Sequence, residues 1–184
     1  PNCVFCKRQL VTIVLKNISN NGNFYNIYGC DHCQISMLNH FPSEEELTKL
    51  YSSGNYRINQ GKRFGYAIET LIHLGRIKKR KRIHQFAKAG KILDIGCGRG
   101  LFLDVMRRGG WDVIGTEFNE ETASQVTKAY GLKVFPGNII QHKLKSESID
   151  AINVNQVLEH LKNPHEIIME SKRLLRSGGI IIIS

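Results

Sequence analysis

The sequence predicts an α/β fold preceded by a small cysteine-rich module. Between residues 90 and 184, short apolar runs alternate with helical segments, which is typical of repeated β-α units around a mostly parallel sheet. An apolar run at 91–95 ends abruptly in three glycines at alternate positions. Two C-x-x-C pairs lie near the N-terminus. We therefore expect a module at 1–40, a helical connector at 41–89 and the α/β core at 90–184.

The four cysteines of the two pairs are candidate metal ligands. They are Cys3, Cys6, Cys30 and Cys33. Two such pairs can present four thiolates to one tetrahedral zinc ion, and the segment between them resembles a hairpin with strands at 10–15 and 24–28, so we expect a zinc ribbon. Disulfides are the competing interpretation, although no secretory signal accompanies the cysteines. His32 is an alternative ligand.

The connector begins with a helix-start signal and then contains a basic segment. Ser43 and Glu46 fit a capping box, and one or two helices are expected within 62–89. The net charge of +10 is concentrated in residues 76–91, which carry eight Lys or Arg residues and no acid. Ile77, Ile83 and Phe86 at helical spacing indicate an amphipathic helix with a wet basic face. Contact with an anionic substrate, RNA or a membrane surface is the alternative to simple solvation.

The glycine-rich turn is the most informative segment of the core. Gly96, Gly98 and Gly100 remove the Cβ atoms that would block a ligand, and the helix predicted at 101–108 begins beside them. The dinucleotide fingerprint G-x-G-x-x-G would need glycine where this chain has Leu101, so a hydride-transfer cofactor is disfavoured. A tight turn without a ligand is the alternative for this motif alone.

The next apolar run, at 111–117, ends in an acidic residue. The carboxyl ends of neighbouring parallel strands line one crevice, so the Glu117 carboxylate would lie where a ribose offers its hydroxyls. Further strands are expected at 133–135, 149–155 and 180–183. Asn119 and Gly131 bound a predicted helix at 120–130, and Asn163 and Pro164 open another.

Four motifs in this order resemble the class I S-adenosylmethionine-dependent methyltransferases over residues 90–184. They are D-x-G-x-G-x-G from Asp94, the acidic strand end, V-L-E-H at 157–160 and L-L-x-x-G-G at 174–179. The resemblance implies a Rossmann-like sheet of order 3-2-1-4-5 with helices on both faces. It also implies S-adenosylmethionine as cofactor. The family usually adds two strands, so the isoleucine-rich edge at 180–183 suggests a piece of a longer protein.

The resemblance also assigns roles to residues around the methionine end of the cofactor. The backbone from Gly96 through Cys97 and Gly98 to Gly100 would run beside the methionine part. Asp94 would hold the ammonium group, directly or through water. Glu117 would bind the ribose hydroxyls.

At the adenine end, Phe118 and Ile139 would sandwich the ring. Asn138 would accept a hydrogen bond from the adenine amino group, where the family commonly has an aspartate. Asn155 is a further contact, close enough to help position an acceptor. Tyr56, in a loop before the core, is another candidate, and packing between modules is its alternative role.

A hydroxyl or carbon acceptor also needs a base. His160 is the candidate, oriented by Glu159, although this pair can equally be a helix-start element. Zinc-ribbon modules ahead of this domain resemble sugar C-methyltransferases and polysaccharide-modifying enzymes, which implies a sugar or nucleotide-sugar acceptor. A non-catalytic or RNA-binding module that binds a polyanion is the other hypothesis, and a steep salt dependence of binding would distinguish it.

No apolar stretch is long enough to span a bilayer, so we expect a cytoplasmic protein.

Overall fold

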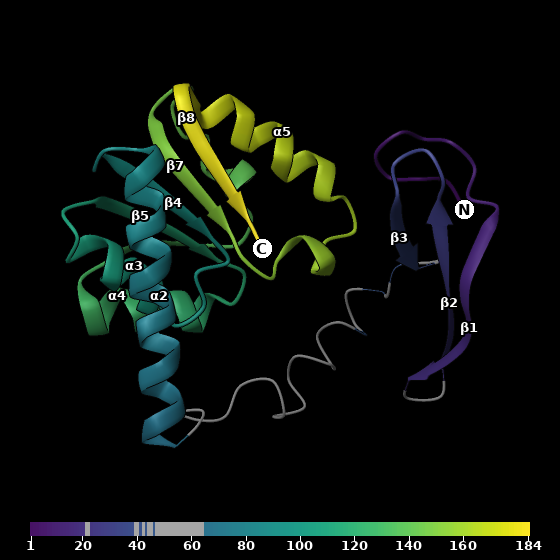
Figure 1. Cartoon of the computed structure of the whole chain (residues 1–184), viewed down its shortest axis with the longest axis horizontal. Helices are drawn as coiled ribbons and strands as arrows, with labels where there is room; N and C mark the ends of the chain where they lie inside the picture. Colours follow the sequence, from purple (N-terminus) through teal and green to yellow (C-terminus); the bar gives the residue numbers. More distant parts are fainter. Residues whose placement is uncertain (21–22, 39–40, 42, 44–45, 47–64) are drawn as a thin grey trace. The chain divides into compact units, whose positions relative to one another are not determined.

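The structure is a computed structural model that describes residues 1–20, 23–38, 41, 43, 46 and 65–184 (Figure 1). The chain divides into two compact units, Pro1–Arg63 and Phe64–Ser184. Tyr56, a predicted cofactor contact, lies outside the described residues. Within them, no helix combines the length and the apolar composition needed to cross a bilayer.

The N-terminal unit contains a three-stranded antiparallel sheet of order β1-β2-β3. Its strands are β1 (Thr12–Asn20), β2 (Asn23–Cys30) and β3 (Ile35–Leu38). The expected hairpin is present, and its strands are longer than predicted. Among the residues of this unit that the structure describes, the buried apolar ones are Cys3, Leu10, Tyr25 and Cys30. So small a core is typical of modules that need an additional cross-link or metal.

The capping box at the start of the connector is confirmed. The Ser43 backbone N–H donates to Glu46 Oε2 at 2.7 Å, and the Glu46 N–H donates to Ser43 Oγ at 3.2 Å. This reciprocal pair satisfies donors that a helix start leaves unpaired.

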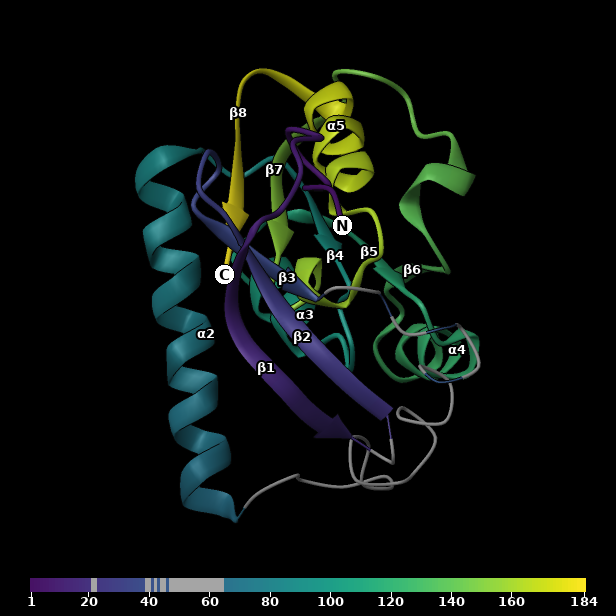
Figure 2. The ribbon, with the colours of Figure 1, turned by 90° about the vertical axis from the view of Figure 1, so that its right-hand side faces the viewer.

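The C-terminal unit is built on a five-stranded sheet whose described pairs are all parallel. The strands are β4 (Lys91–Ile95), β5 (Asp112–Glu117), β6 (Lys133–Pro136), β7 (Ile149–Val154) and β8 (Leu175–Ile183). Their order is β6-β5-β4-β7-β8, which Figure 2 shows from right to left. Counted along the chain within this sheet, the order is 3-2-1-4-5.

The edge strand β8 differs in detail from the expected strand at 180–183. It begins at Leu175, and its pairing with β7 shifts register between Ile149 and Ala151. Gly178 has a φ of 75°, which glycine adopts readily. The glycine-containing segment before the expected strand is therefore a bulge within β8.

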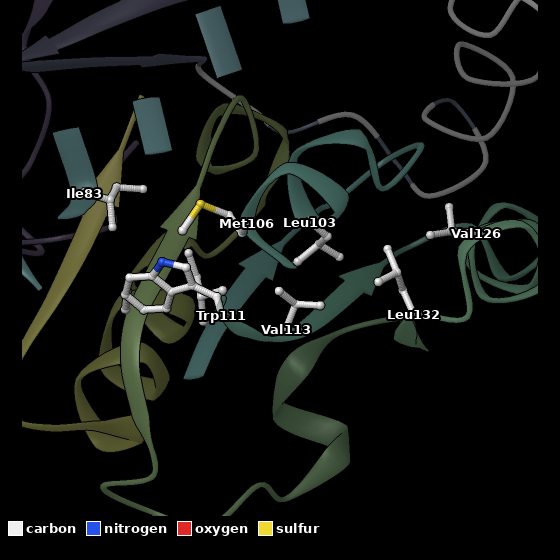
Figure 3. Packing of buried hydrophobic residues seen from close by; sticks show 9 residues of the cluster. Ile83, Leu103, Met106, Trp111, Val113, Val126 and Leu132 are labelled. Carbon is white, nitrogen blue, oxygen red and sulfur yellow. The ribbon is translucent and has the colours of Figure 1, made fainter. Parts of the chain in front are cut away.

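Helices lie on both faces of the sheet, as expected. They are α2 (Tyr66–Phe86), α3 (Leu101–Arg107), α4 (Glu120–Tyr130) and α5 (Pro164–Leu174), with short 3-10 helices η1 (Ile139–His142) and η2 (Leu158–His160). Side chains of α2, α3 and α4 join one buried cluster (Figure 3), and those of α5 and η1 join the other. Because alternate strand residues point to opposite faces, Ile92 belongs to the first cluster and Leu93 to the second.

The predicted ends of α4 are confirmed. The Asn119 side chain accepts a hydrogen bond from the Thr122 N–H at 2.8 Å, and Gly131 ends the helix with a φ of 64°. For α5, Pro164 stands in the first turn, but the Asn163 side chain donates to Glu166 Oε1 at 2.7 Å instead of capping the backbone.

The basic helix α2 corrects two expectations. Phe86 was expected on the apolar face, but it is the last helical residue and 69% exposed, whereas Ile83 is buried against the core. The basic face is also not fully exposed to solvent, because the Arg80 guanidinium donates to the Val105 carbonyl at 3.1 Å. The helix therefore packs on α3 through part of its basic face. It shares a compact unit with the sheet, and the predicted domain boundaries stay predictions.

Leu103→Ala should lower the free energy of unfolding of the C-terminal unit by about 2 to 5 kcal/mol, because Leu103 is 0% exposed in the core cluster. The single tryptophan, Trp111, is buried in the same cluster, so its fluorescence during urea titration reports on this unit. Leu71→Ala on α2, where the side chain is 67% exposed, is the matched control and should change stability by less than about 0.5 kcal/mol. Equal losses in both variants would contradict the observed packing.

Candidate functional site

The glycine turn after β4 has the geometry of a ligand-binding cradle. Gly96, Gly98 and Gly100 all have φ between 53° and 72°. A Cβ at Gly96 would lie 2.4 Å from Val157 Cγ2, and one at Gly100 would lie 2.4 Å from Val126 Cγ1. A Cβ at Gly98 would meet no atom within 4 Å. The outer glycines are therefore required by packing, whereas Gly98 presents bare backbone to open space.

Glu117 at the end of β5 is fixed beside this turn. Its carboxylate accepts from the Gly98 N–H and from the Asn119 N–H, each at 3.0 Å. The side chain is buried, and the Cys97 N–H also donates to the Thr116 carbonyl at 2.8 Å. A carboxylate offers about four lone-pair positions, so a group of this kind can accept bonds from ligand hydroxyls as well as from backbone donors. The structure thus brings Glu117 and the glycine turn together.

Asp94 and Asn153 form a buried polar pair on adjacent strands. Asn153 Nδ2 donates to Asp94 Oδ1 at 2.6 Å. Asn153 Oδ1 is buried without a hydrogen-bond partner among the described residues. Burial raises the pKa of Asp94 to about 7, although the Asn153 hydrogen bond and the charge of Lys79 oppose the increase. A buried carboxyl group with a pKa near 7, next to an amide oxygen that lacks a hydrogen-bond partner, is a common feature of ligand sites.

Lys79 is a site residue that the sequence alone did not predict, because its basic run was expected on a solvated face. In the structure, Lys79 Nζ donates to Asn155 Oδ1 and to Ser184 Oγ, each at 3.1 Å. Nζ also lies 5.5 Å from the centre of the Phe102 ring. Burial lowers the pKa of Lys79, and the charge of Asp94 acts in the opposite direction. The available signal was its position four residues before Ile83, on the same helix face.

The predicted adenine contacts occupy unlike environments. Phe118, directly after β5, is 83% exposed, whereas Ile139 is 1% exposed within the second core cluster. The Asn138 side chain accepts from the Ile140 N–H at 3.1 Å and so caps η1. Phe118 therefore offers an accessible ring, while Ile139 would need local movement to reach a ligand. These adenine contacts stay predictions.

Two further predicted residues have modest local interactions. His160 Nε2 lies 3.9 Å from Glu159 Oε1 on η2, and both side chains are partly exposed. Their catalytic roles stay a prediction. Cys97 in the glycine turn is half-buried, and burial together with the charges of Asp94 and Glu117 raises its pKa. The Cys97 thiol therefore remains protonated and is no nucleophile at neutral pH.

In the N-terminal unit, Cys3, Cys6, Cys30 and Cys33 bring four sulfur atoms within 4.8 Å of one another. The Sγ atoms of Cys3 and Cys33 are 3.9 Å apart, and those of Cys6 and Cys30 are 3.6 Å apart. A tetrahedral zinc with Zn–S bonds of about 2.3 Å requires S···S separations of about 3.8 Å. The donor set therefore fits zinc, and these thiols are not joined as disulfides. His32 is not part of the cluster.

The C-terminal unit is similar in sequence to known methyltransferases. Residues 93–183 match the family model described as a methyltransferase domain. A protein of Mycolicibacterium smegmatis named "Probable S-adenosylmethionine-dependent methyltransferase" is 35% identical over 98 residues, covering 50% of this chain and 37% of that protein. A ubiquinone biosynthesis O-methyltransferase of Maricaulis maris is 34% identical over 98 residues, covering 50% and 39%.

The fold likeness extends to solved structures. A crystal structure of a Pyrococcus horikoshii protein has a TM-score of 0.56 and 22% identity, and the match covers 73% of this chain and 64% of that one. This likeness concerns the fold alone. The chain spans about two fifths of the length of the curated relatives it matches.

The burial of Asp94 predicts a specific pH dependence of stability. The folded-state pKa of about 7 lies above the ordinary value of 3.8, so the folded protein binds the proton more tightly than the unfolded chain. The contribution of Asp94 to stability is then greatest below about pH 4 and falls as pH rises toward 7. We expect the free energy of unfolding of the original chain, relative to Asp94→Asn, to fall by about 2 to 3 kcal/mol between pH 5 and 8. A difference that is constant with pH in Trp111-monitored urea unfolding would contradict this assignment.

Proposed function

We propose that this protein, whose residues 93–183 form a class I S-adenosylmethionine-dependent methyltransferase domain, transfers the cofactor's methyl group to a small-molecule acceptor. The observation that carries the proposal is the open backbone at Gly98, which donates to the buried carboxylate of Glu117 and follows the strand that holds the buried Asp94. A turn that served packing alone would not leave its central glycine facing open space while fixing an acidic residue beside it.

The bound cofactor would supply an already activated methyl group, so the chain's task is to bind, to orient and to exclude water. Glu117 would accept the ribose hydroxyls, because its carboxylate is already held in place by two backbone donors. Asp94 would hold the ammonium of the methionine part. Phe118 would cover the adenine, with Asn138 accepting from its amino group. Each role uses a group located at the carboxyl ends of the parallel strands.

For the acceptor, our finer proposal is a sugar or nucleotide-sugar. The supporting observation is the cysteine cluster ahead of the methyltransferase domain, since that combination resembles sugar-modifying methyltransferases. His160 would remove the acceptor proton, with Glu159 as its orienting partner. Relatives named as ubiquinone O-methyltransferases make a phenolic hydroxyl the alternative acceptor. A screen of nucleotide-sugars and catechols for release of S-adenosylhomocysteine separates the two classes.

A polyanion-binding module is the second candidate function, favoured by the exposed cations of α2. Lys78, Lys81 and Arg82 are exposed on this helix. Lys79 and Arg80, by contrast, make their hydrogen bonds within the C-terminal unit. This division leaves fewer cations available to a polyanion than the sequence count implies.

We also propose that the cysteine cluster binds one structural zinc ion. Burial raises the pKa of Cys3, but hydrogen bonds from the Cys6 and Phe5 backbones and from neighbouring thiols together lower it to about 7. A hydrogen bond with the Cys6 side chain raises the pKa of Cys33 to about 12. Four thiols crowded together thus resist full ionisation without a cation to balance their charge. Four cysteine ligands form a closed site, so the zinc would have a structural role and no catalytic one.

Glu117→Ala should weaken binding of S-adenosylhomocysteine about tenfold or more, because a charge-assisted hydrogen bond to the ribose is lost. Isothermal calorimetry measures the affinity, and Trp111 fluorescence checks that the fold is retained. Glu121→Ala, an exposed change of the same type in the first turn of α4, is the control and should leave the affinity unchanged. Unaltered binding by Glu117→Ala, or tight NAD binding by the original chain instead, would exclude this function.

Zinc removal or Cys30→Ser should unfold the N-terminal unit while sparing the C-terminal one, because small metal modules gain much of their folding free energy from the ion. Elemental analysis should find one zinc per chain, and Trp111 fluorescence should not change. Cys97→Ser, outside the cluster, is the control and should retain the full metal content. Less than about half an equivalent of metal in the intact chain, or disulfides seen by mass spectrometry, would refute the zinc site.

A further inference from the structure

Lys79 is directed from α2 toward the strand ends that line the proposed cofactor site. Its two hydrogen-bond acceptors, Asn155 and Ser184, follow β7 and β8 respectively. Its charge also acts on Asp94, at the carboxyl end of β4. One helical side chain therefore contacts the ends of two neighbouring strands and acts electrostatically on a third, at the edge of the sheet where a ligand would bind.

The ammonium of Lys79 is held by neutral groups. Its hydrogen-bond acceptors are an amide oxygen and a hydroxyl oxygen, and it makes no ion pair within 4.0 Å with any residue that the structure describes. It is half-buried, and partial removal of a cation from water is unfavourable unless an anion compensates. The position is therefore prepared for a negatively charged group that arrives with a ligand.

The neighbouring Asp94 also lacks a charged hydrogen-bond partner among the described residues, and its own charge is negative. It is buried, and its carboxylate receives one side-chain hydrogen bond, from neutral Asn153. An amino-acid zwitterion carries its ammonium and carboxylate on a single carbon atom, so a site that recognises it needs an acid and a base close together. Asp94 and Lys79 carry these two charges, and each is near enough to shift the pKa of the other.

We propose that Lys79 binds the carboxylate of the cofactor's amino-acid end while Asp94 binds the ammonium. This inference rests on the proposed function. An acceptor phosphate is the competing anion, but Asp94 beside Lys79 would repel a group that carries no compensating positive charge. Lys79 is then the residue that distinguishes cofactors with an amino-acid end from adenosine derivatives without one.

The test compares two ligands that differ in this end alone. S-adenosylhomocysteine carries the zwitterion, whereas 5′-methylthioadenosine keeps the adenosine and lacks it. By calorimetry, Lys79→Met should weaken binding of S-adenosylhomocysteine about tenfold to a hundredfold, the loss typical of a charge-assisted hydrogen bond. Binding of 5′-methylthioadenosine should change less than about twofold. Lys79→Arg should restore part of the lost affinity.

Lys78→Met is the matched control, because it removes the same charge from an exposed neighbouring position on α2. It should leave both affinities unchanged. Trp111 fluorescence establishes folding of each variant, and Lys79→Gln, which keeps a hydrogen-bond donor, replaces Lys79→Met if the latter is destabilised.

The outcomes separate this inference from the function on which it rests. If the original chain binds neither ligand, both proposals fail. If it binds them and Lys79→Met weakens both equally or neither, the role of Lys79 is refuted while the proposed function stands. If Lys79→Met abolishes binding of inorganic pyrophosphate but retains full affinity for S-adenosylhomocysteine, Lys79 serves an acceptor anion and the inference is overturned.

Discussion

The candidate site depends on the parallel pairing of β4 with β5 on one side and β7 on the other. In this register Asp94 lies opposite Asn153, which places their side chains on the same face and allows their 2.6 Å hydrogen bond. The parallel direction also brings the end of β5, with Glu117, next to the glycine turn that follows β4. A slip of one residue would turn Asn153 toward the opposite core cluster, so the apolar burial on both faces fixes the polar site.

The same arrangement concentrates polar groups where burial is costly. Asp94, Asn153 and Glu117 are buried at the strand ends, and Lys79 approaches them from α2. The described part of the chain partly satisfies these groups but offers no hydrogen-bond partner to Asn153 Oδ1. Purely structural polar networks are usually complete, whereas sites for polar ligands retain unsatisfied groups that the ligand completes. This difference supports a binding role for the crevice over a structural one.

Local signals made much of this fold predictable. The glycines of the turn, the Asn119 and Gly131 helix ends, the Ser43–Glu46 capping box and the spacing of the cysteines each encode their structure within a few residues. The features that differed depend on distant contacts. Phe86 and Ile83 have the same helical spacing, and only the position of α3 determines which one is buried. The early start of β8 requires β7 as a partner. Lys79 could not be singled out because sequence periodicity does not show what its long side chain reaches.

Ligand recognition and ionisation are linked in a site of this kind. With a pKa of about 7, Asp94 is partly protonated at neutral pH in the free protein, yet holding an ammonium group requires its carboxylate form. The proposed ligand would therefore stabilise the ionised state that burial disfavours. Lys79 acts in the same direction, because its positive charge lowers the pKa of Asp94. The lysine on α2 thus connects the packing of that helix to the charge state of the central strand, and a shift of α2 would alter the affinity for an ammonium group without changing any residue on the sheet.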